Sequence, residues 1–159
     1  MKNHSGFTLL ETLVYSGIVA GIITVALLTA YQFIDGSDRL KYHWEMVENQ
    51  KILEQKIYWT LQNISAINSP SAGATTTSLS INKLNFASNP VVIDSSGGIA
   101  RLQRGGGAFN PITTELSEVR FLTFHRDDFD GRPAIKVDAE IFNPYSSTTI
   151  EIHTTIITK

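Results

Sequence analysis

The stretch from Thr12 to Ile34 constrains this chain most, because its 23 residues include no Asp, Glu, Lys or Arg. Leu, Ile, Val and Ala dominate it, and no proline interrupts it. A helix needs roughly 20 apolar residues to cross a bilayer, whereas a secretory signal peptide has a shorter apolar core of roughly 7–15 residues and then a small-residue cleavage site. The stretch is too long for such a signal, and Thr29-Ala30-Tyr31 is a poor cleavage site. The sequence therefore predicts a membrane-spanning helix.

Glu11 stands immediately before this stretch and needs an explanation of its own. A carboxylate within a membrane helix costs on the order of 2.5–3.5 kcal/mol at the helix centre, and less near an end. Lys2 is too close to the chain start to reach it comfortably, and Arg39 and Lys41 lie at the other end of the span. An ordinary single-pass anchor explains the apolar stretch but leaves Glu11 unexplained. We therefore expect the partner of Glu11 on another chain.

Residues 5–13, which read SGFTLLETL, closely resemble the N-terminal signature of type IV pilins and their relatives. In that family a short leader with a positive charge ends in Gly, and a prepilin peptidase cuts after it. The new first residue, usually Phe, is N-methylated, and a Glu stands at the fifth mature position. The resemblance implies that residues 1–6 are the leader, that the cut falls between Gly6 and Phe7, that Phe7 is methylated and that Glu11 holds the fifth position. It covers about the first thirty residues.

The resemblance also implies how Glu11 finds its partner. In pilin-like filaments the N-terminal helices bundle in a central core, so the amine that cleavage leaves on Phe7 can meet Glu11 of a neighbouring subunit. Subunits that dock out of register would leave both charges unpaired in an apolar core, which is costly. We therefore expect Glu11 to set register and recruitment. Gly17 and Gly21 have the spacing that lets membrane helices approach closely, although Gly is common in such helices.

Helical character continues beyond the apolar stretch. Residues 35–38 (DGSD) mark the exit from the membrane, and Gly36 is expected to bend the helix there. The segment 39–64 then has an apolar stripe at helical spacing, which predicts a helix to about residue 65 that packs on a sheet. The stripe consists of Met46, Leu53, Ile57, Leu61 and Ile64. Three aromatic residues near this helix (Trp44, Tyr58 and Trp59) suggest core or interface positions more than a stacking platform for a ligand.

The remainder of the chain predicts antiparallel strands from about residue 78 to 159. Residues 68–78 (NSPSAGATTTS) indicate a loop. Leu79 and Ile81 alternate with polar residues, and Leu84 and Phe86 resume the alternation after a one-residue slip that a bulge would produce. An SSGG turn predicts a hairpin between residues 91–93 and 99–102, and the segments VRFLTFH, AIKVDAEIF and TTIEIHTTIIT predict three more strands.

These elements give an α+β fold: a long N-terminal helix whose second half packs on an antiparallel β-sheet. The expected divisions are the leader at 1–6, a transmembrane or filament-core helix at 7–34 and an exported α+β domain at 35–159. This is also the plan that the family resemblance implies.

The acidic segment around residue 128 is the one candidate for a metal. The sequence matches part of the pattern of a calcium-binding loop at Asp128, Asp130 and Gly131. However, Arg126 stands at the first ligand position of that pattern, and no Glu stands at the twelfth. A tight hairpin in which Asp-Gly supplies the positive φ angles is the interpretation that we favour.

Other chemistry has little support in the sequence. Gly105, Gly106 and Gly107 follow Arg104, but no helix start with Lys-Ser or Lys-Thr comes after them, so a turn is favoured over a phosphate loop. There is no cysteine, the four histidines lack zinc-site spacing, and no nucleophile elbow is present. A net charge of −2 gives no reason to expect nucleic acid as a partner. We expect no enzymatic activity and no cofactor.

The resemblance implies a structural subunit of a type IV pilus or of a related type II secretion or competence filament. A minor pilin or a J-type pseudopilin is favoured over a major pilin, because no Pro stands near Leu28, no cysteine pair is present, and a strand, an Asp-Gly turn and a second strand come late in the chain. The implied partners are prepilin peptidase, other pilin subunits, an inner-membrane assembly platform and the lipid bilayer. The positive-inside rule places Lys2 in the cytoplasm and the β domain outside, before assembly into an extracytoplasmic filament.

Two other classes remain open. A membrane-tethered extracytoplasmic binding module that does not polymerise would leave Gly6-Phe7 uncut and would not need Glu11. An exported enzyme would need a pocket with convergent polar groups.

Overall fold

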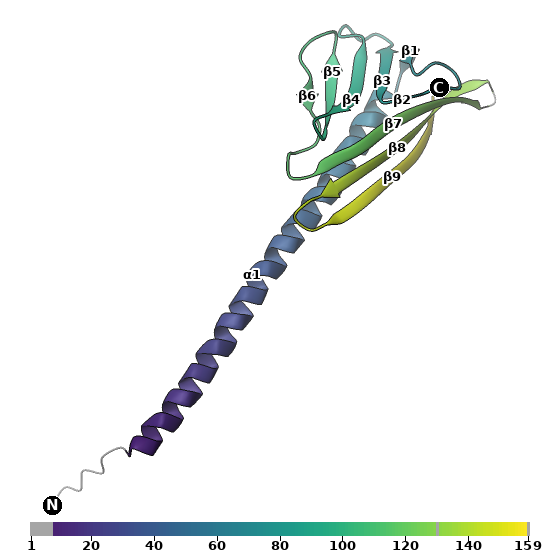
Figure 1. Cartoon of the computed structure of the whole chain (residues 1–159). Helices are drawn as coiled ribbons and strands as arrows, with labels where there is room; N and C mark the ends of the chain where they lie inside the picture. The colour runs from purple at the N-terminus through teal and green to yellow at the C-terminus, as the bar shows by residue number, and fades with distance from the viewer. Residues whose placement is uncertain (1–7, 130, 159) are drawn as a thin grey trace, which may run out of the picture. The chain divides into compact units, whose positions relative to one another are not determined.

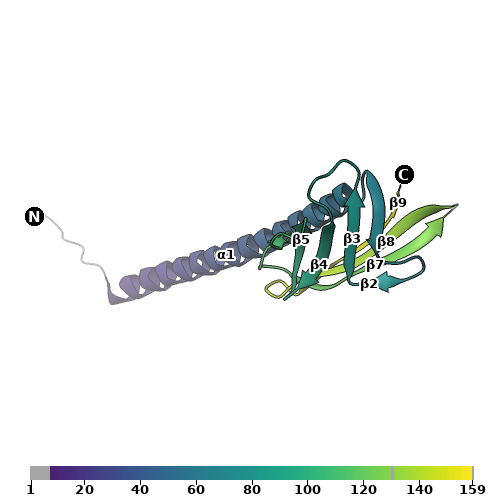
Figure 2. The same cartoon turned by 90° about the horizontal axis from the view of Figure 1, so that it is seen from above.

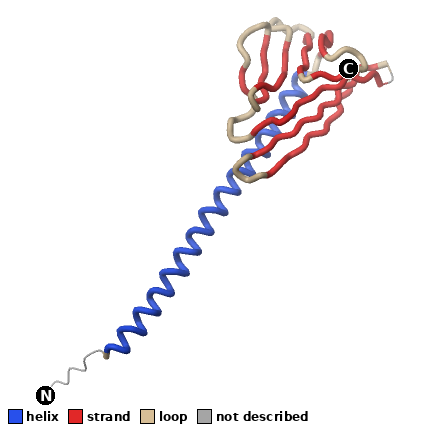
Figure 3. Tube along the Cα trace, viewed as in Figure 1, coloured by secondary structure: helices blue, strands red, loops and turns tan. Residues whose placement is uncertain are grey.

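The computed structural model describes residues 8–129 and 131–158. The predicted cleavage and methylation sites at Gly6 and Phe7, and the candidate calcium ligand Asp130, lie outside the described residues. The chain divides into two compact units, Met1–Leu40 and Lys41–Lys159. The fold is α+β, as predicted: one helix is followed by antiparallel strands (Figures 1 and 3).

The helix α1 (Leu9–Thr60) is 52 residues long and belongs to both units. It continues through residues 35–38, where the sequence predicted a bend at Gly36. An ion pair between Arg39 Nε and Asp35 Oδ2, 3.1 Å apart and one turn away from each other, bridges this segment. A single Gly costs about 1 kcal/mol relative to Ala, which is less than the cost of nucleating a second helix. The helix therefore tolerates Gly36 without a break.

The helix ends at Thr60, about five residues earlier than predicted. Asn63 has a φ of 53°, the left-handed conformation that Asn tolerates and that stops a helix. Ile64, predicted on the helical stripe, begins the first strand instead and is half-buried. Strand structure therefore starts well before residue 78.

The strands form two antiparallel sheets in place of the single predicted sheet (Figures 1 and 2). The five-stranded sheet has the order β1-β3-β4-β5-β6, with β1 (Ile64–Ser69), β3 (Ser78–Lys83), β4 (Val91–Ser96), β5 (Ile99–Arg104) and β6 (Asn110–Pro111). The four-stranded sheet has the order β2-β7-β8-β9, with β2 (Thr75–Thr76), β7 (Glu118–Phe129), β8 (Arg132–Asn143) and β9 (Thr148–Ile157).

Two local predictions about the strands fail for identifiable reasons. Segment 68–78 was predicted as a loop, but it contains the end of β1 and all of β2. The pairing of β1 with β3 has register shifts on both sides of Ala66-Ile67, which removes the two-residue periodicity that marks a strand in sequence. The predicted bulge before Leu84 is instead the end of β3 at Lys83, followed by a left-handed Asn85.

Both predicted hairpins are confirmed. Ser96 pairs with Ile99 across Gly97 and Gly98, which both have positive φ, as a tight hairpin turn requires. Phe129 pairs with Arg132 at the other hairpin, where the φ of Gly131 is 72°. The favoured interpretation of the acidic segment as a hairpin therefore holds for the residues that are described.

The core of the second unit lies between the helix and the sheets. Met46, Leu53 and Ile57 from the predicted stripe are buried, and so is Leu61 just beyond the helix end. The strands bury alternate residues against them, as β8 shows with Val137, Ala139 and Ile141. β7 adds Leu122 and Phe124 to the same hydrophobic core. The second half of the helix thus packs on antiparallel sheet, as the sequence predicted.

Candidate functional site

The first turn of α1 is built by Thr8 and Glu11. The Thr8 hydroxyl accepts a hydrogen bond from the Glu11 backbone N–H at 3.3 Å, and the Thr8 carbonyl accepts from the N–H groups of Glu11 and Thr12. Thr8 is therefore the N-cap and Glu11 is the third helical residue, the spacing of a capping box. The Thr-x-x-Glu motif was a signal for this start that the sequence interpretation did not use. A carboxylate in this turn also interacts favourably with the helix dipole.

The Glu11 side chain is exposed. Within residues 8–129 and 131–158, no hydrogen bond or ion pair holds its carboxylate. The described geometry is thus consistent with a partner for Glu11 that does not belong to this helix. The predicted partner, the amine of Phe7, lies outside the described residues.

The following turns of α1 present apolar side chains on every face. Each of the fifteen large ones between residues 9 and 34 is between 50% and 84% exposed. They are Leu9, Leu10, Leu13, Val14, Tyr15, Ile18, Val19, Ile22, Ile23, Val25, Leu27, Leu28, Tyr31, Phe33 and Ile34. A helix that is apolar all round needs lipid or other helices around it. By length and composition, this is the one helix among the described residues that can cross a membrane, with a mean hydropathy of 2.1 over an 18-residue window.

The Ser and Thr hydroxyls in this segment are satisfied by the helix itself. The hydroxyls of Ser16, Thr24 and Thr29 donate to backbone carbonyls four residues earlier, at 2.6–2.8 Å. Thr12 likewise donates to the carbonyl of Leu9 at 2.9 Å. In hydrocarbon an unpaired hydroxyl would be costly, so these bonds make the segment compatible with an apolar environment.

Gly17 and Gly21 leave open space on the helix surface. A Cβ atom added at either position would meet nothing within 4 Å, apart from the helix's own backbone. The predicted close approach of another helix at this place therefore has room, and the described residues form no second helix that could occupy it.

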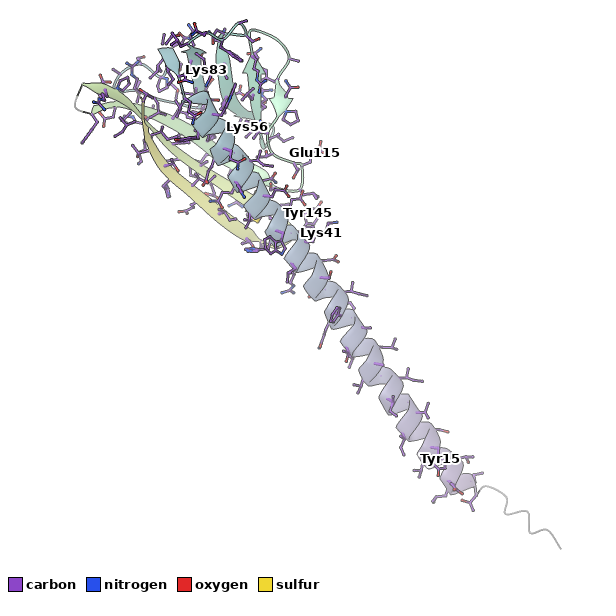
Figure 4. The ribbon with its side chains drawn as sticks, turned by 180° about the vertical axis from the view of Figure 1, so that it is seen from behind. Tyr15, Lys41, Lys56, Lys83, Glu115 and Tyr145 are labelled. Atoms are coloured by element: carbon purple, nitrogen blue, oxygen red, sulfur yellow. The ribbon has the colours of Figure 1, made fainter. Side chains whose placement is uncertain are left out.

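In the second unit, Lys83 at the end of β3 holds the C-terminal end of α1 (Figure 4). Its ammonium donates to the backbone carbonyls of Trp59, Thr60 (3.3 Å) and Gln62 (2.6 Å). The carbonyls of Trp59 and Thr60 are among those that a helix end leaves without an intrahelical partner, and that of Gln62 lies two residues beyond the helix. A cation there also complements the helix dipole. Burial lowers the pKa of Lys83, which is only 8% exposed. Sequence analysis missed this role because the two segments are more than twenty residues apart.

Trp59, one of the aromatic residues considered as a stacking platform, is already covered by its own domain. Lys83 Nζ lies 4.4 Å from its ring centroid and the Arg104 guanidinium carbon lies 4.9 Å from it. The Phe86 ring packs edge-to-face with Trp59, with 5.9 Å between the two ring centroids. Trp59 is therefore a packing residue, as expected. Trp44 is 65% exposed.

Asn49 is a second buried polar anchor on α1. Its side-chain amide donates to the hydroxyls of Ser117 (2.6 Å) and Thr114 (3.0 Å), and its carbonyl oxygen accepts from the Thr114 backbone N–H at 3.2 Å. The Thr114 hydroxyl in turn donates to Glu45 at 2.7 Å. This network fixes the loop before β7 on the helix.

The outer face of the four-stranded sheet carries a charged cluster. His153 Nδ1 lies 2.7 Å from Asp138 Oδ1, and His153 Nε2 lies 3.3 Å from Glu151 Oε2. Lys136 Nζ lies 3.3 Å from Asp138 Oδ2. The hydrogen bond to Asp138 and then that to Glu151 raise the pKa of His153, and the bond from His153 lowers the pKa of Asp138. No group of three or more His, Cys, Asp or Glu side chains suited to a metal ion occurs among the described residues.

No family model, no curated protein sequence and no solved structure matches this chain. The class of protein is therefore defined by the fold and by the apolar helix. A long N-terminal helix with an apolar first part, followed by antiparallel sheets, is a pilin-like architecture.

Proposed function

We propose that this chain is a structural subunit of a pilin-like filament, in the manner of a minor pilin or a pseudopilin. Its apolar helix anchors it in the cytoplasmic membrane and later enters the filament core, and its β domain is exported. The observation that carries this proposal is the combination of an apolar helix that is exposed on all faces with a first-turn carboxylate, Glu11, that no described residue pairs. An isolated anchor needs the first feature but not the second.

The proposed assembly begins with cleavage between Gly6 and Phe7 by prepilin peptidase and with methylation of Phe7. The new amine of one subunit pairs with Glu11 of a neighbour, and the assembly platform moves the subunit out of the bilayer. Pairing removes the cost that each charge would have alone in an apolar core. The support for these steps is the resemblance of residues 5–13 to the prepilin signature.

The first experiment is an intact mass measurement with N-terminal sequencing of the full chain from its native membrane. We expect a mature chain that begins with methylated Phe7. A chain that still carries residues 1–6, in cells with active prepilin peptidase, would contradict the proposal and would favour the tethered binding module.

The second experiment separates the proposed charge pair from a purely local role of Glu11. A capping box accepts Gln as well as Glu, so Glu11→Gln keeps a suitable residue at the helix start while it removes the charge, at a local cost of only about 0.3–1 kcal/mol for the lost interaction with the helix dipole. We expect Glu11→Gln to reduce incorporation of the protein into sheared filaments at least about tenfold, because one buried charge then lacks its partner. The matched control is Thr12→Val, which changes a neighbouring side chain that bonds only to its own helix. Normal incorporation of Glu11→Gln would show that only the local role matters.

A further inference from the structure

A pocket of about 750 Å³ lies between the edge of one sheet and the hairpin of the other. One wall is β1, residues 64–67, and the other is the β7–β8 hairpin with Arg126 and Arg132, closed by Thr158. Figure 1 shows the β7–β8 hairpin reaching the side of the domain where β1 lies. We call this the arginine pocket. It is separate from the apolar helix and from Glu11, so it is independent of the proposed filament function.

Arg126 is the best-placed binding group in this pocket. Its backbone is fixed, because its N–H donates to the Ala74 carbonyl at 3.0 Å and its carbonyl accepts from the Gly73 N–H at 2.8 Å. Its Nε is buried and has no hydrogen-bond partner in the described residues. The nearest carboxylate oxygen among the described residues, Asp128 Oδ1, lies 3.9 Å away, which is too far for a hydrogen bond. A buried donor without an acceptor is costly. Because this Nε is covered, a ligand reaches Arg126 through the rest of its side chain, which as a whole is 22% exposed.

Arg132 adds a second guanidinium to the same wall. It is exposed, and no ion pair holds it among the residues that the structure describes. Guanidinium groups bind carboxylates and phosphates through paired hydrogen bonds. The pocket therefore has the chemistry of an anion site.

Charge and shape favour a carboxylate over a phosphate. Asp128 does not line the pocket, but its carboxylate lies 3.9 Å from Arg126 Nε and offsets part of the charge of the two arginines, which favours a monoanion over a phosphate monoester with its charge of about −1.5 to −2. The walls also include the apolar side chains of Ile64, Ile67 and Pro133, which suit the aliphatic part of an acidic side chain. The volume is larger than one carboxylate needs, so it has room for several residues of a chain.

The position of β1 indicates how that chain is held. Among the residues that the structure describes, β1 is the end strand of its sheet and pairs only with β3, so one edge of its backbone has no strand partner there. An extended peptide gains affinity from main-chain hydrogen bonds at such an edge and specificity from side-chain pockets beside it. We propose that the arginine pocket binds an extended peptide segment of a partner protein, with one acidic side chain of that segment on Arg126 and Arg132.

The test uses the full chain in detergent micelles and a fluorescein-labelled seven-residue peptide of alternating Val and Thr with a central Glu. Fluorescence anisotropy is measured for this peptide and for versions with central Gln or phosphoserine. We expect the Glu peptide to bind, and the Gln peptide to bind at least about tenfold more weakly, since a charged hydrogen bond is lost. Arg126→Gln should weaken binding of the Glu peptide by a similar factor.

Two further variants test whether weaker peptide binding results from the loss of the pocket's charge. Arg132→Gln changes an exposed side chain and should weaken binding without affecting folding. Arg120→Gln is the matched control, because Arg120 is also on β7 but pairs with Glu140 at 3.0 Å, and it should bind as the unchanged protein does. Equal binding of the Glu and Gln peptides, or no binding of either, would overturn the proposal. Tighter binding of the phosphoserine peptide than of the Glu peptide would also overturn it, in favour of a phosphate ligand.

Discussion

The contact between Lys83 and the end of α1 provides the sharpest test of how this fold is held together. Lys83→Met keeps the length and apolar body of the side chain but removes the ammonium that donates to the carbonyls of Trp59 and Thr60 at the helix end and of Gln62 just beyond it. The loss of charged hydrogen bonds is worth about 1.5–3 kcal/mol, and the loss of a cation at the helix end about 0.3–1 kcal/mol. Relief of the burial cost that lowers the Lys83 pKa offsets part of this. We expect a net destabilisation of about 3 kcal/mol.

The assay is thermal unfolding of the full chain in detergent micelles, followed by near-ultraviolet circular dichroism, to which Trp59 beside Lys83 contributes. For a unit of this size, about 3 kcal/mol corresponds to a decrease in Tm of about 12 °C. The matched control is Lys56→Met, because Lys56 is an exposed lysine on the same helix (Figure 4). We expect Lys56→Met to change Tm by less than about 2 °C. If Lys83→Met changed Tm no more than this control, the assignment of Lys83 as the helix cap would be refuted.

Further predictions concern pH and backbone conformation. The pKa of His153 is raised in the folded protein, so this residue stabilises the fold below its usual pKa of 6.5, and the effect is lost as pH rises through its folded pKa. The pKa of Asp138 is lowered, so this residue stabilises the fold above its usual pKa of 3.8, and that effect is lost on acidification. The Tm difference between the unchanged protein and His153→Gln should therefore be largest between pH 3.8 and pH 6.5 and should shrink at higher pH. A Tm difference that does not vary with pH would contradict this prediction. Gly98→Ala should lower stability by about 1–2 kcal/mol in denaturant unfolding, because φ there is 77° and the new Cβ would lie 3.0 Å from a neighbouring side chain. Gly36→Ala, in open helix, should instead add up to about 1 kcal/mol, and a loss there would contradict the unbroken helix.

Local sequence patterns predicted the parts of this protein that depend on local chemistry. The uncharged stretch after Glu11 indicated the apolar helix, because the period and length of an apolar run do not depend on distant contacts. The stripe that includes Leu53 and Ile57 identified the buried face for the same reason. The Asp-Gly and Gly-Gly turns were predictable because few residues adopt positive φ. Glu11 was identified as a candidate site because it is a charged residue beside an apolar segment that offers no partner for it.

The tertiary structure decided what depends on which surfaces meet. β1 lacks a clean alternation, so only its pairing with β3 makes it a strand. The helix ends at Thr60 because Asn63 turns the chain and Lys83, from a later strand, binds the last carbonyls. The division of the strands into two sheets brings β1 beside Arg126, more than fifty residues away, and so creates the arginine pocket. Periodicity fixes which face of an element is buried, but the free energy of pairing two distant elements is set by contacts that exist only once both have folded.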